Sequence, residues 1–239
     1  MDKINTNYSP DERPRRRKFL SVDPGTTNFG YVTGETDLDF ENLKITGGEV
    51  VDITNMHTTL REEQNCDLDH RKCPANWMLH FIRRHKDYID ECEYILVESQ
   101  PPFENASTVS VEQILLAMYH TKIKTCIPCS MHKRFQVAGR HIGDLTERRE
   151  WRKRNVIEKA MKYLDTEQRE SFDKYRHKDW SSDQMQHVSD ATCQMVYMVE
   201  KLASAYKRSR KDHEIKNKVM IGKKLTVSEM FEQFRHKKS

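Results

Sequence analysis

The stretch FLSVDPGTTNFGYV (residues 19–32) is apolar up to Val22 and then places a single carboxylate, Asp23, where the apolar run stops. Gly25 follows two residues later, and a second apolar run begins after Asn28. Two short apolar runs separated by a glycine-containing turn are typical of a β-hairpin. We therefore predict strands over residues 18–23 and 28–33, with Asp23 at the end of the first strand and Gly25 allowing a tight turn.

The rest of the chain continues as strands followed by alternating helices and strands. Apolar residues recur at helical or strand spacing along most of it. Such an order predicts an α/β fold, with a mixed five-stranded sheet flanked by helices. The predicted strands are 43–51, 94–97 and 122–128, and the predicted helices are 74–88, 109–119, 149–164 and 184–206.

Glu98 is a second carboxylate at the end of a strand, directly after the apolar residues 94–97. If this strand neighbours the one that ends at Asp23, both carboxylates emerge at one edge of the sheet. Two bare carboxylates side by side repel each other, and Mg²⁺, which prefers oxygen ligands, would offset the repulsion. The alternative is structural: Asp23 begins an Asp-Pro-Gly turn and Glu98 caps a helix.

The last predicted helix carries two stripes. Its polar stripe has spacings of four, three and four, and its apolar stripe would hold the helix on the sheet. The polar stripe could then reach Asp23 and Glu98, although taken alone it is an ordinary polar helix face. The polar stripe consists of Asp183, His187, Asp190 and Gln194, and the apolar stripe of Met185, Val188, Thr192, Met195, Val199, Leu202 and Tyr206.

The chain has 239 residues and a formal net charge of +4, and this charge is unevenly distributed. Residues 207–239 hold eleven Lys/Arg against four Asp/Glu, a net +7, which leaves −3 for the rest. We expect a disordered basic arm over residues 1–17, a folded domain over 18–206 and a basic tail over 207–239. Basic ends favour a polyanionic partner, or else they form a solvated tail or a nuclear localisation signal.

These motifs together resemble the Holliday-junction resolvases of the RuvC type, most closely the branch of poxviruses and other large DNA viruses. The resemblance lies in Asp-x-Gly-x-x-Asn at 23–28, Glu-x-Gln at 98–100 and His-x-x-Asp at 187–190. It implies an RNase H-like fold and an endonuclease that cuts four-way DNA junctions as a homodimer. It also implies two Mg²⁺ ions per active site, with Mn²⁺ able to substitute.

The resemblance further implies roles for individual residues. Asp23 would bridge both metal ions, Glu98 would hold one of them and Asp190 the other. His187 stands where many members have Asp, so it would ligate a metal ion, orient the attacking water or position the phosphate. The residues expected to contact DNA are Gly25, Asn28, Gln100, Arg152, Lys153, Arg154, Lys174 and Lys178.

Several features remain open to more than one interpretation. Cys66, His70 and Cys73 could join Cys126, Cys129 and His132 in a zinc site if the segments met, although the spacing is not that of a standard zinc finger. Aromatic and basic residues alternate between Phe172 and Trp180 and could stack on unpaired bases. The apolar side of 109–119 could form a dimer interface, and ordinary core packing is the favoured alternative.

Three other functions compete with junction resolution. A sugar-kinase-like ATPase also begins with Asp-x-Gly-Thr-Thr, but the chain has only eight glycines and is short for two lobes. A non-catalytic nucleic-acid-binding protein would be expected to lack one carboxylate of the set. Another RNase H-like nuclease, acting on RNA–DNA hybrids or transposon ends, would use the same carboxylates. Without a membrane-length apolar run or a secretory signal, we expect an intracellular protein, nuclear or at a cytoplasmic viral replication site.

Overall fold

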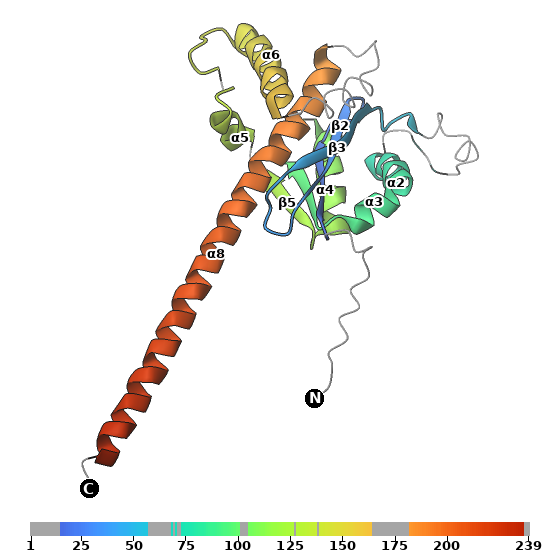
Figure 1. Ribbon diagram of the computed structural model, residues 1–239. Coiled ribbons are helices and arrows are strands. Elements are labelled where there is room, and N and C mark those ends of the chain that lie inside the picture. Colours follow the sequence, from blue (N-terminus) through green and yellow to red (C-terminus); the bar gives the residue numbers. More distant parts are fainter. Residues whose placement is uncertain are drawn as a thin grey trace. The chain divides into compact units, whose positions relative to one another are not determined.

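The computed structural model divides the chain into two compact units, residues 1–199 and 200–239. None of its described helices is long and apolar enough to cross a membrane. Most of the expected N-terminal arm lies outside the described residues. The structure describes residues 15–56, 68, 70, 73–100, 105–126, 128–137, 139–163 and 182–236 (Figure 1).

The first unit contains a mixed five-stranded sheet with the order β3-β2-β1-β4-β5. β1 pairs antiparallel with β2, and β2 with β3, whereas β1 pairs parallel with β4, and β4 with β5. The predicted α/β class with a mixed, helix-flanked sheet is confirmed. The strands are β1 Arg17–Asp23, β2 Phe29–Thr36, β3 Lys44–Val51, β4 Tyr94–Glu98 and β5 Ile123–Cys126.

The helices follow the predicted order, with three differences. The predicted helix 74–88 is broken at His85, whose ring packs against those of Tyr31 and Phe81. The strand predicted to reach Pro128 ends at Cys126, because this proline begins a short helix. The last helix continues thirty residues beyond its predicted end. The helices are α2 Pro74–Arg84, α3 Lys86–Glu91, α4 Ala106–Tyr119, α5 Pro128–Arg134, α6 Leu145–Tyr163 and α8 Ser182–His236.

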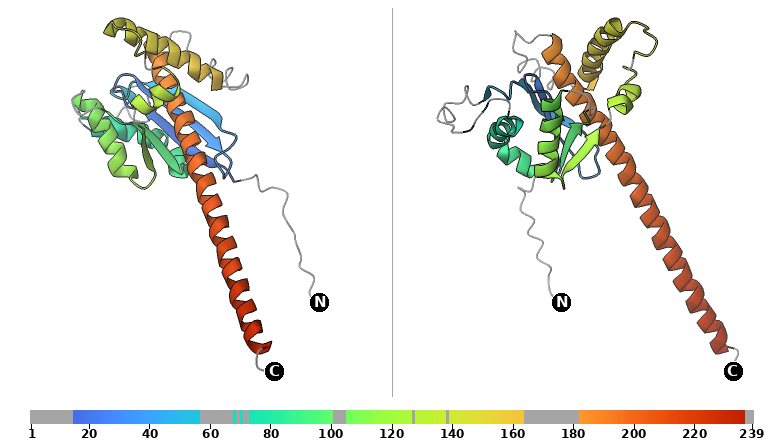
Figure 2. Two further views of the ribbon diagram at one scale, coloured as in Figure 1. Left: turned by 90° about the vertical axis from the view of Figure 1, so that its left-hand side faces the viewer. Right: turned by 180° about the vertical axis from the view of Figure 1, so that it is seen from behind.

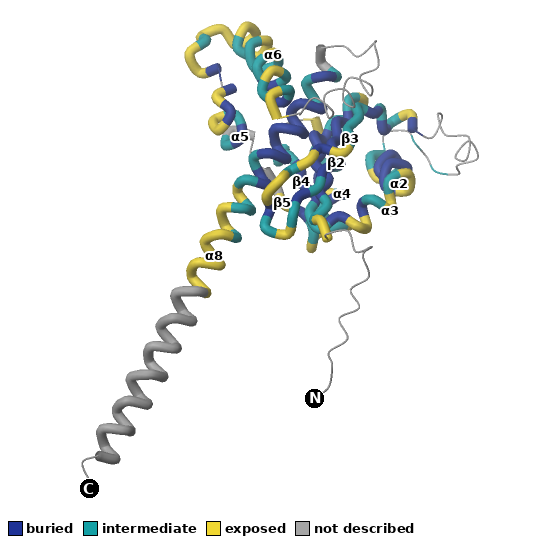
Figure 3. The backbone as a smooth tube through the Cα atoms, viewed as in Figure 1, coloured by how far each residue is buried: buried dark blue, intermediate teal, exposed yellow. Residues whose placement is uncertain are grey.

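Helices α2, α3 and α4 cover one face of the sheet (Figure 2). The apolar residues of α2 that recur at helical spacing, such as Phe81, are all buried (Figure 3). They share one core with β1 residues such as Leu20 and Val22. On α4, Val111 and Leu115 are buried in this core, which is the favoured alternative to a dimer interface. These contacts bury the face of the sheet that lies opposite α8.

The first part of α8, up to Val199, covers the opposite face. Val188 and Met195 of the predicted apolar stripe are buried there. The approach is close because β2 carries a glycine beneath the helix: a Cβ built on Gly30 would lie 2.7 Å from the carbonyl carbon of His187 and 2.8 Å from its Cβ. Any larger residue at position 30 would push the helix away from the sheet.

Three basic residues at and just before the start of β1 contact carboxylates of the fold. Arg16 pairs with Glu35, and Arg17 pairs with Glu93. Lys18 contacts Glu91. These partners reduce the positive charge that this segment presents to a polyanion.

Substituting Gly30 by Ala should destabilise the protein by about 2–4 kcal/mol, because the new methyl group meets the backbone of α8 rather than a movable side chain. Urea denaturation followed by circular dichroism measures the change. Gly143→Ala is the matched control, since a Cβ there has no neighbour within 4 Å. Equal stability of the two variants would contradict the close approach of α8.

Candidate active site

Asp23 and Glu98 reach the same edge of the sheet because their strands are parallel neighbours. Val22 of β1 pairs with Val97 of β4, so each carboxylate follows one step beyond this pair. The turn after Asp23 is tight: the Gly25 N–H donates to the Asp23 carbonyl at 3.0 Å. A Cβ on Gly25 would lie 2.3 Å from the Asn28 carbonyl oxygen, so the turn requires glycine. The turn predicted at Asp23 is therefore present, and it leaves the carboxylate at the edge of the sheet, where its role as a metal ligand stays a prediction.

Helix α8 brings the third and fourth predicted side chains to this edge. His187 Nδ1 lies 2.6 Å from Asp23 Oδ2. Asp190 is 8% exposed and faces the same region one turn further along. Gln194 fixes the helix on the strand, because its Nε2 donates to the Val22 carbonyl at 3.2 Å.

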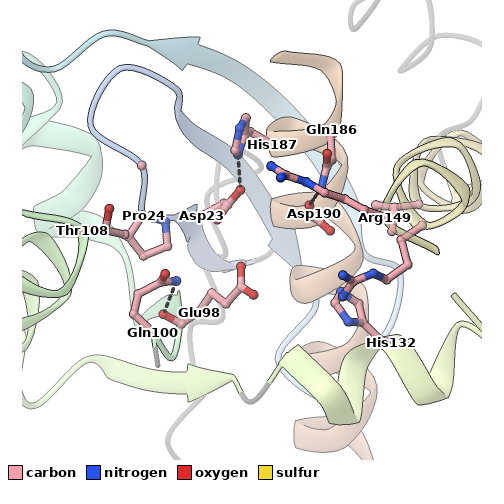
Figure 4. A pocket seen from close by; sticks show the side chains of 13 residues that line it. Asp23, Pro24, Glu98, Gln100, Thr108, His132, Arg149, Gln186, His187 and Asp190 are labelled. Carbon is pink, nitrogen blue, oxygen red and sulfur yellow. Dashed lines mark hydrogen bonds and ion pairs between the residues drawn. The ribbon is translucent and has the colours of Figure 1, made fainter. Parts of the chain in front are cut away.

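A cavity of about 520 Å³ joins these side chains (Figure 4). All four predicted catalytic residues line it, although 167 positions separate Asp23 from Asp190 in the sequence. The remaining walls come from the turn after β1, the β4–α4 connection, and helices α4, α5, α6 and α8. The lining residues are Asp23, Pro24, Gly25, Glu98, Gln100, Thr108, His132, Arg149, Arg152, Val156, Gln186, His187 and Asp190.

The electrostatics of the cavity favour a cation. Burial, and then the neighbouring Asp23 carboxylate, raise the pKa of Asp190 well above that of an ordinary aspartate. One oxygen of Asp190 accepts a hydrogen bond from Gln186 Nε2 at 3.2 Å. Its other oxygen, Oδ1, is buried and has no hydrogen-bond partner among the residues that the structure describes. An orphaned carboxylate oxygen beside a second carboxylate suits a hard divalent cation such as Mg²⁺.

The donors do not yet form a closed metal site. Within the described ranges, no three His, Cys, Asp or Glu side chains are grouped so that they could hold a metal ion. Asp23 is instead engaged with His187. The residue types and the shared cavity fit Mg²⁺, although one oxygen of Asp23, Oδ2, is engaged with His187.

Basic side chains from α5 and α6 form the wall near Asp190, and most of them were not predicted. Arg149 extends from α6 into the cavity in Figure 4, and Arg152 of the same helix lines it. The Nε atom of Arg152 is buried without a hydrogen-bond partner among the described residues. Burial, and then Arg152, lower the pKa of His132 to about 4, so its imidazole is neutral at physiological pH. The basic character of the 149–164 segment signalled Arg149, whereas nothing in the sequence placed His132 here.

The segment after Glu98 is held by a buried carboxylate that the sequence did not reveal. Glu112 of α4 accepts a hydrogen bond from the Gln100 backbone N–H at 3.0 Å and is 6% exposed. The Gln100 side chain donates in turn to the Glu98 carbonyl at 3.4 Å. Glu98 does not cap α4, because the side chain of Asn105 accepts from the Ser107 N–H in that role. The structural alternative for Glu98 is therefore wrong.

Some of the residues expected to contact DNA lie elsewhere. Gly25, Gln100 and Arg152 line the cavity, whereas Asn28, Lys153 and Arg154 do not. Lys153 pairs with Glu150 of its own helix at 3.2 Å, and Arg154 is exposed. Lys174 and Lys178, with the aromatic residues beside them, lie outside the described residues. The side chain of Asp183 also lies outside the described part of the chain.

The solved structures that share this fold include two resolvases. The yeast mitochondrial Holliday junction resolvase Ydc2 matches with a TM-score of 0.55 at 14% identity, over 82% of this chain and 86% of its own. The fowlpox virus resolvase in complex with substrate Holliday junction DNA matches with a TM-score of 0.50 at 16% identity, over 77% of this chain and 98% of its own. No protein-family model matches the sequence, and no curated protein does. The fold is therefore the RNase H-like fold of these resolvases, as predicted, while the poxvirus branch stays a prediction.

The neutral state of His132 makes the protein sensitive to acid. The pKa of this imidazole is about 4 in the folded protein and near 6.5 in the unfolded chain, so protonation favours unfolding as pH falls through this window. The contribution of His132 to the free energy of unfolding should therefore fall by about 3 kcal/mol between pH 7 and pH 4, at about 1.4 kcal/mol per pKa unit. Urea denaturation in chelator-treated buffer at both pH values measures it.

A His132→Gln variant should lose this part of the acid sensitivity, because it has no imidazole to protonate. His120→Gln removes an exposed imidazole and is the control. If the difference in free energy of unfolding between pH 7 and pH 4 is the same for His132→Gln and the unsubstituted protein, His132 is not buried in its neutral form.

Proposed function

We propose that the chain is an endonuclease that resolves four-way DNA junctions by Mg²⁺-dependent hydrolysis of a phosphodiester in each of two strands. The observation that carries the proposal is that Asp23, Glu98, His187 and Asp190 line one cavity at the end of the sheet. The fold supports it, because Ydc2 and the fowlpox virus enzyme are both named as resolvases and the latter is bound to Holliday junction DNA.

The carboxylates of this cavity would hold two Mg²⁺ ions. Asp23 would contribute to both ions, Glu98 to one and Asp190 to the other. The ions supply Lewis acidity: they lower the pKa of an attacking water and neutralise charge on the phosphate and the leaving oxygen. The unpartnered Oδ1 of Asp190 supports its assignment as a ligand.

His187 has a role that follows from its contact with Asp23. Its Nδ1 holds Asp23 Oδ2 in place, so the imidazole orients the carboxylate at the centre of the site. If Asp23 used this oxygen to hold a cation, the same nitrogen would be available to hydrogen-bond the attacking water or a phosphate oxygen. These are two of the three roles expected from the sequence, and the third, direct ligation of a metal ion by His187, stays a prediction.

Arg149 and Arg152 would bind the phosphate that enters the cavity. A guanidinium donates two parallel hydrogen bonds to phosphate oxygens, and the unpartnered Nε of Arg152 leaves such a donor available. The neutral His132 beside them adds no charge to this wall. Lys153 and Arg154 lie on the same helix outside the cavity, and together with the basic tail they would bind DNA backbone independently of sequence.

A homodimer would let the protein cut both strands. A four-way junction offers two symmetry-related strands, and a two-fold interface places one active site on each. The exposed Met118 of α4 remains a candidate for such an interface, whereas Val111 and Leu115 are committed to the core.

The other RNase H-like nucleases remain the second candidate, because RNA–DNA hybrids and transposon ends are cut by the same carboxylates. With Mg²⁺, the purified protein should make paired nicks in a synthetic four-way junction and leave linear duplex intact. Cleavage of junction, flap, duplex and RNA–DNA hybrid should be compared side by side on gels. Preferential cutting of the hybrid would replace the junction proposal with this alternative.

Asp23→Asn should abolish cleavage by removing the shared ligand, while junction binding in gel shifts stays intact. Ser21→Ala, on the same strand, is a control that leaves the carboxylates in place. If binding is lost together with cleavage in a folded Asp23→Asn protein, the carboxylate has a different role from the one proposed.

Arg152→Ala and Arg154→Ala test whether the two arginines of α6 have different roles, with Arg152 acting in the cavity and Arg154 binding the DNA backbone outside it. Arg152→Ala should lower the single-turnover cleavage rate by about 100-fold, as loss of a donor to a charged transition state does. Arg154→Ala should leave that rate unchanged and reduce the salt dependence of binding, by about 0.9 in the slope of log K against log salt for one lost phosphate contact. Equal cleavage rates for the two variants would show that Arg152 does not act in the cavity.

A further inference from the structure

The zinc set suggested by the sequence is not brought together in the described part of the chain. His132 lines the carboxylate cavity instead, whereas Cys66 and the side chains of Cys126 and Cys129 lie outside the described residues. The buried group whose contacts do point to a function is a carboxylate of α4.

Glu112 of α4 is buried outside the cavity but contacts the chain beside it. Its side chain is 6% exposed, and its Oε2 accepts a hydrogen bond from the Gln100 backbone N–H at 3.0 Å. Glutamate is seldom buried to this extent unless its charge is paired or hydrogen-bonded. The segment that Glu112 holds therefore indicates what the residue does.

Glu112 occupies a position that core packing alone would give to an apolar residue. Val111 precedes it directly, Leu115 follows three residues later, and both are buried in the core beneath α4. These spacings place the three side chains on one face of the helix. Burying a carboxylate there costs free energy that an apolar side chain would not cost. Stability of the helix alone does not account for glutamate at this position.

The sheet does not hold Gln100, because the strand ladders stop before it. β4 makes its last pairs at Val97 with β1 and at Glu98 with β5. Two residues beyond, the Gln100 N–H finds its acceptor in Glu112 instead of in a neighbouring strand. The Gln100 side chain turns back and donates to the Glu98 carbonyl at 3.4 Å (Figure 4). The chain on the C-terminal side of Glu98 is thus anchored to α4.

We propose that Glu112 is a positioning residue, which fixes the backbone after Glu98 and so holds the Glu98 carboxylate ready for a divalent cation. The inference rests on the proposed function, in which Glu98 is a metal ligand. A carboxylate on a loose strand end loses conformational freedom when it binds a cation, and this loss weakens binding. The contact with Glu112 orders the strand end on folding instead. Glu112 acts through Gln100 and touches neither the cation nor DNA.

Amide hydrogen exchange of the full-length protein, followed by NMR, tests the hydrogen bond. The Gln100 N–H should exchange slowly in the wild-type protein and about 10-fold faster in Glu112→Ala, as loss of one hydrogen bond allows. Glu112→Gln keeps an acceptor oxygen and should restore slow exchange. If Glu112→Ala does not fold, Glu112→Met removes the oxygen with similar volume and helix propensity. Unprotected exchange of this N–H in the wild-type protein would overturn the proposal.

Mn²⁺ binding, measured by electron paramagnetic resonance without DNA, tests the effect on the cation. Glu112→Ala should bind Mn²⁺ about 10-fold more weakly, as loss of a group that orients a ligand does, and Glu112→Gln should bind it as the wild-type protein does. Cleavage by Glu112→Ala should require about 10-fold more Mg²⁺, with junction affinity in chelator unchanged. Gln113→Ala, at the exposed neighbouring position of α4, is the control and should change none of these values.

Unchanged Mn²⁺ affinity in a folded Glu112→Ala or Glu112→Met protein would overturn the positioning role. Weak binding in Glu112→Gln together with slow Gln100 exchange would also overturn it, because the hydrogen bond would then be present without its effect. A wild-type protein that binds no Mn²⁺ would instead overturn the proposed metal site itself. The two failures are distinguishable, since only the first leaves a wild-type protein that binds the cation.

Discussion

The close approach of α8 to the sheet at Gly30 is the constraint on which the site depends. The helix backbone at His187 passes so near β2 that only a hydrogen can occupy the position beneath it. This distance brings His187 Nδ1 to 2.6 Å from Asp23 and carries Asp190 into the same cavity one turn later. The strands alone would place only two carboxylates at this edge, and the helix turns the pair into a set of four.

The same constraint places the Asp190 carboxylate close to that of Asp23, and their repulsion favours a cation in the cavity. Burial and the Asp23 carboxylate both raise the pKa of Asp190, so its charged form is unfavourable without a counterion. Arg149 and Arg152 lie across the cavity, where they reduce the negative potential without contacting Asp190 Oδ1. The proposed cation and phosphate would thus be bound by one arrangement, with carboxylates on the sheet side and guanidinium groups on the α6 side.

The sequence predicted the features that follow from local periodicity, and missed those set by tertiary contacts. Strand ends at Asp23 and Glu98 are visible because an apolar run stops there, and the stripe with His187 and Asp190 is visible because helix period is regular. His132 and Glu112 carry no such signal, since their positions depend on how α5 and α4 meet the sheet. The break at His85 is likewise a consequence of its packing against Tyr31.

Asp190 is the residue that favours the proposed nuclease over a protein of the same fold that only binds DNA. A buried carboxylate with an unsatisfied oxygen costs folding free energy, and replacing it with an amide or an apolar residue would relieve that cost. A binding module gains nothing from keeping such a group, because phosphate contacts come from the arginines. The proposed enzyme would keep it, because its orphaned oxygen could hold a divalent cation. The destabilising carboxylate is therefore the strongest physical argument for catalysis in this chain.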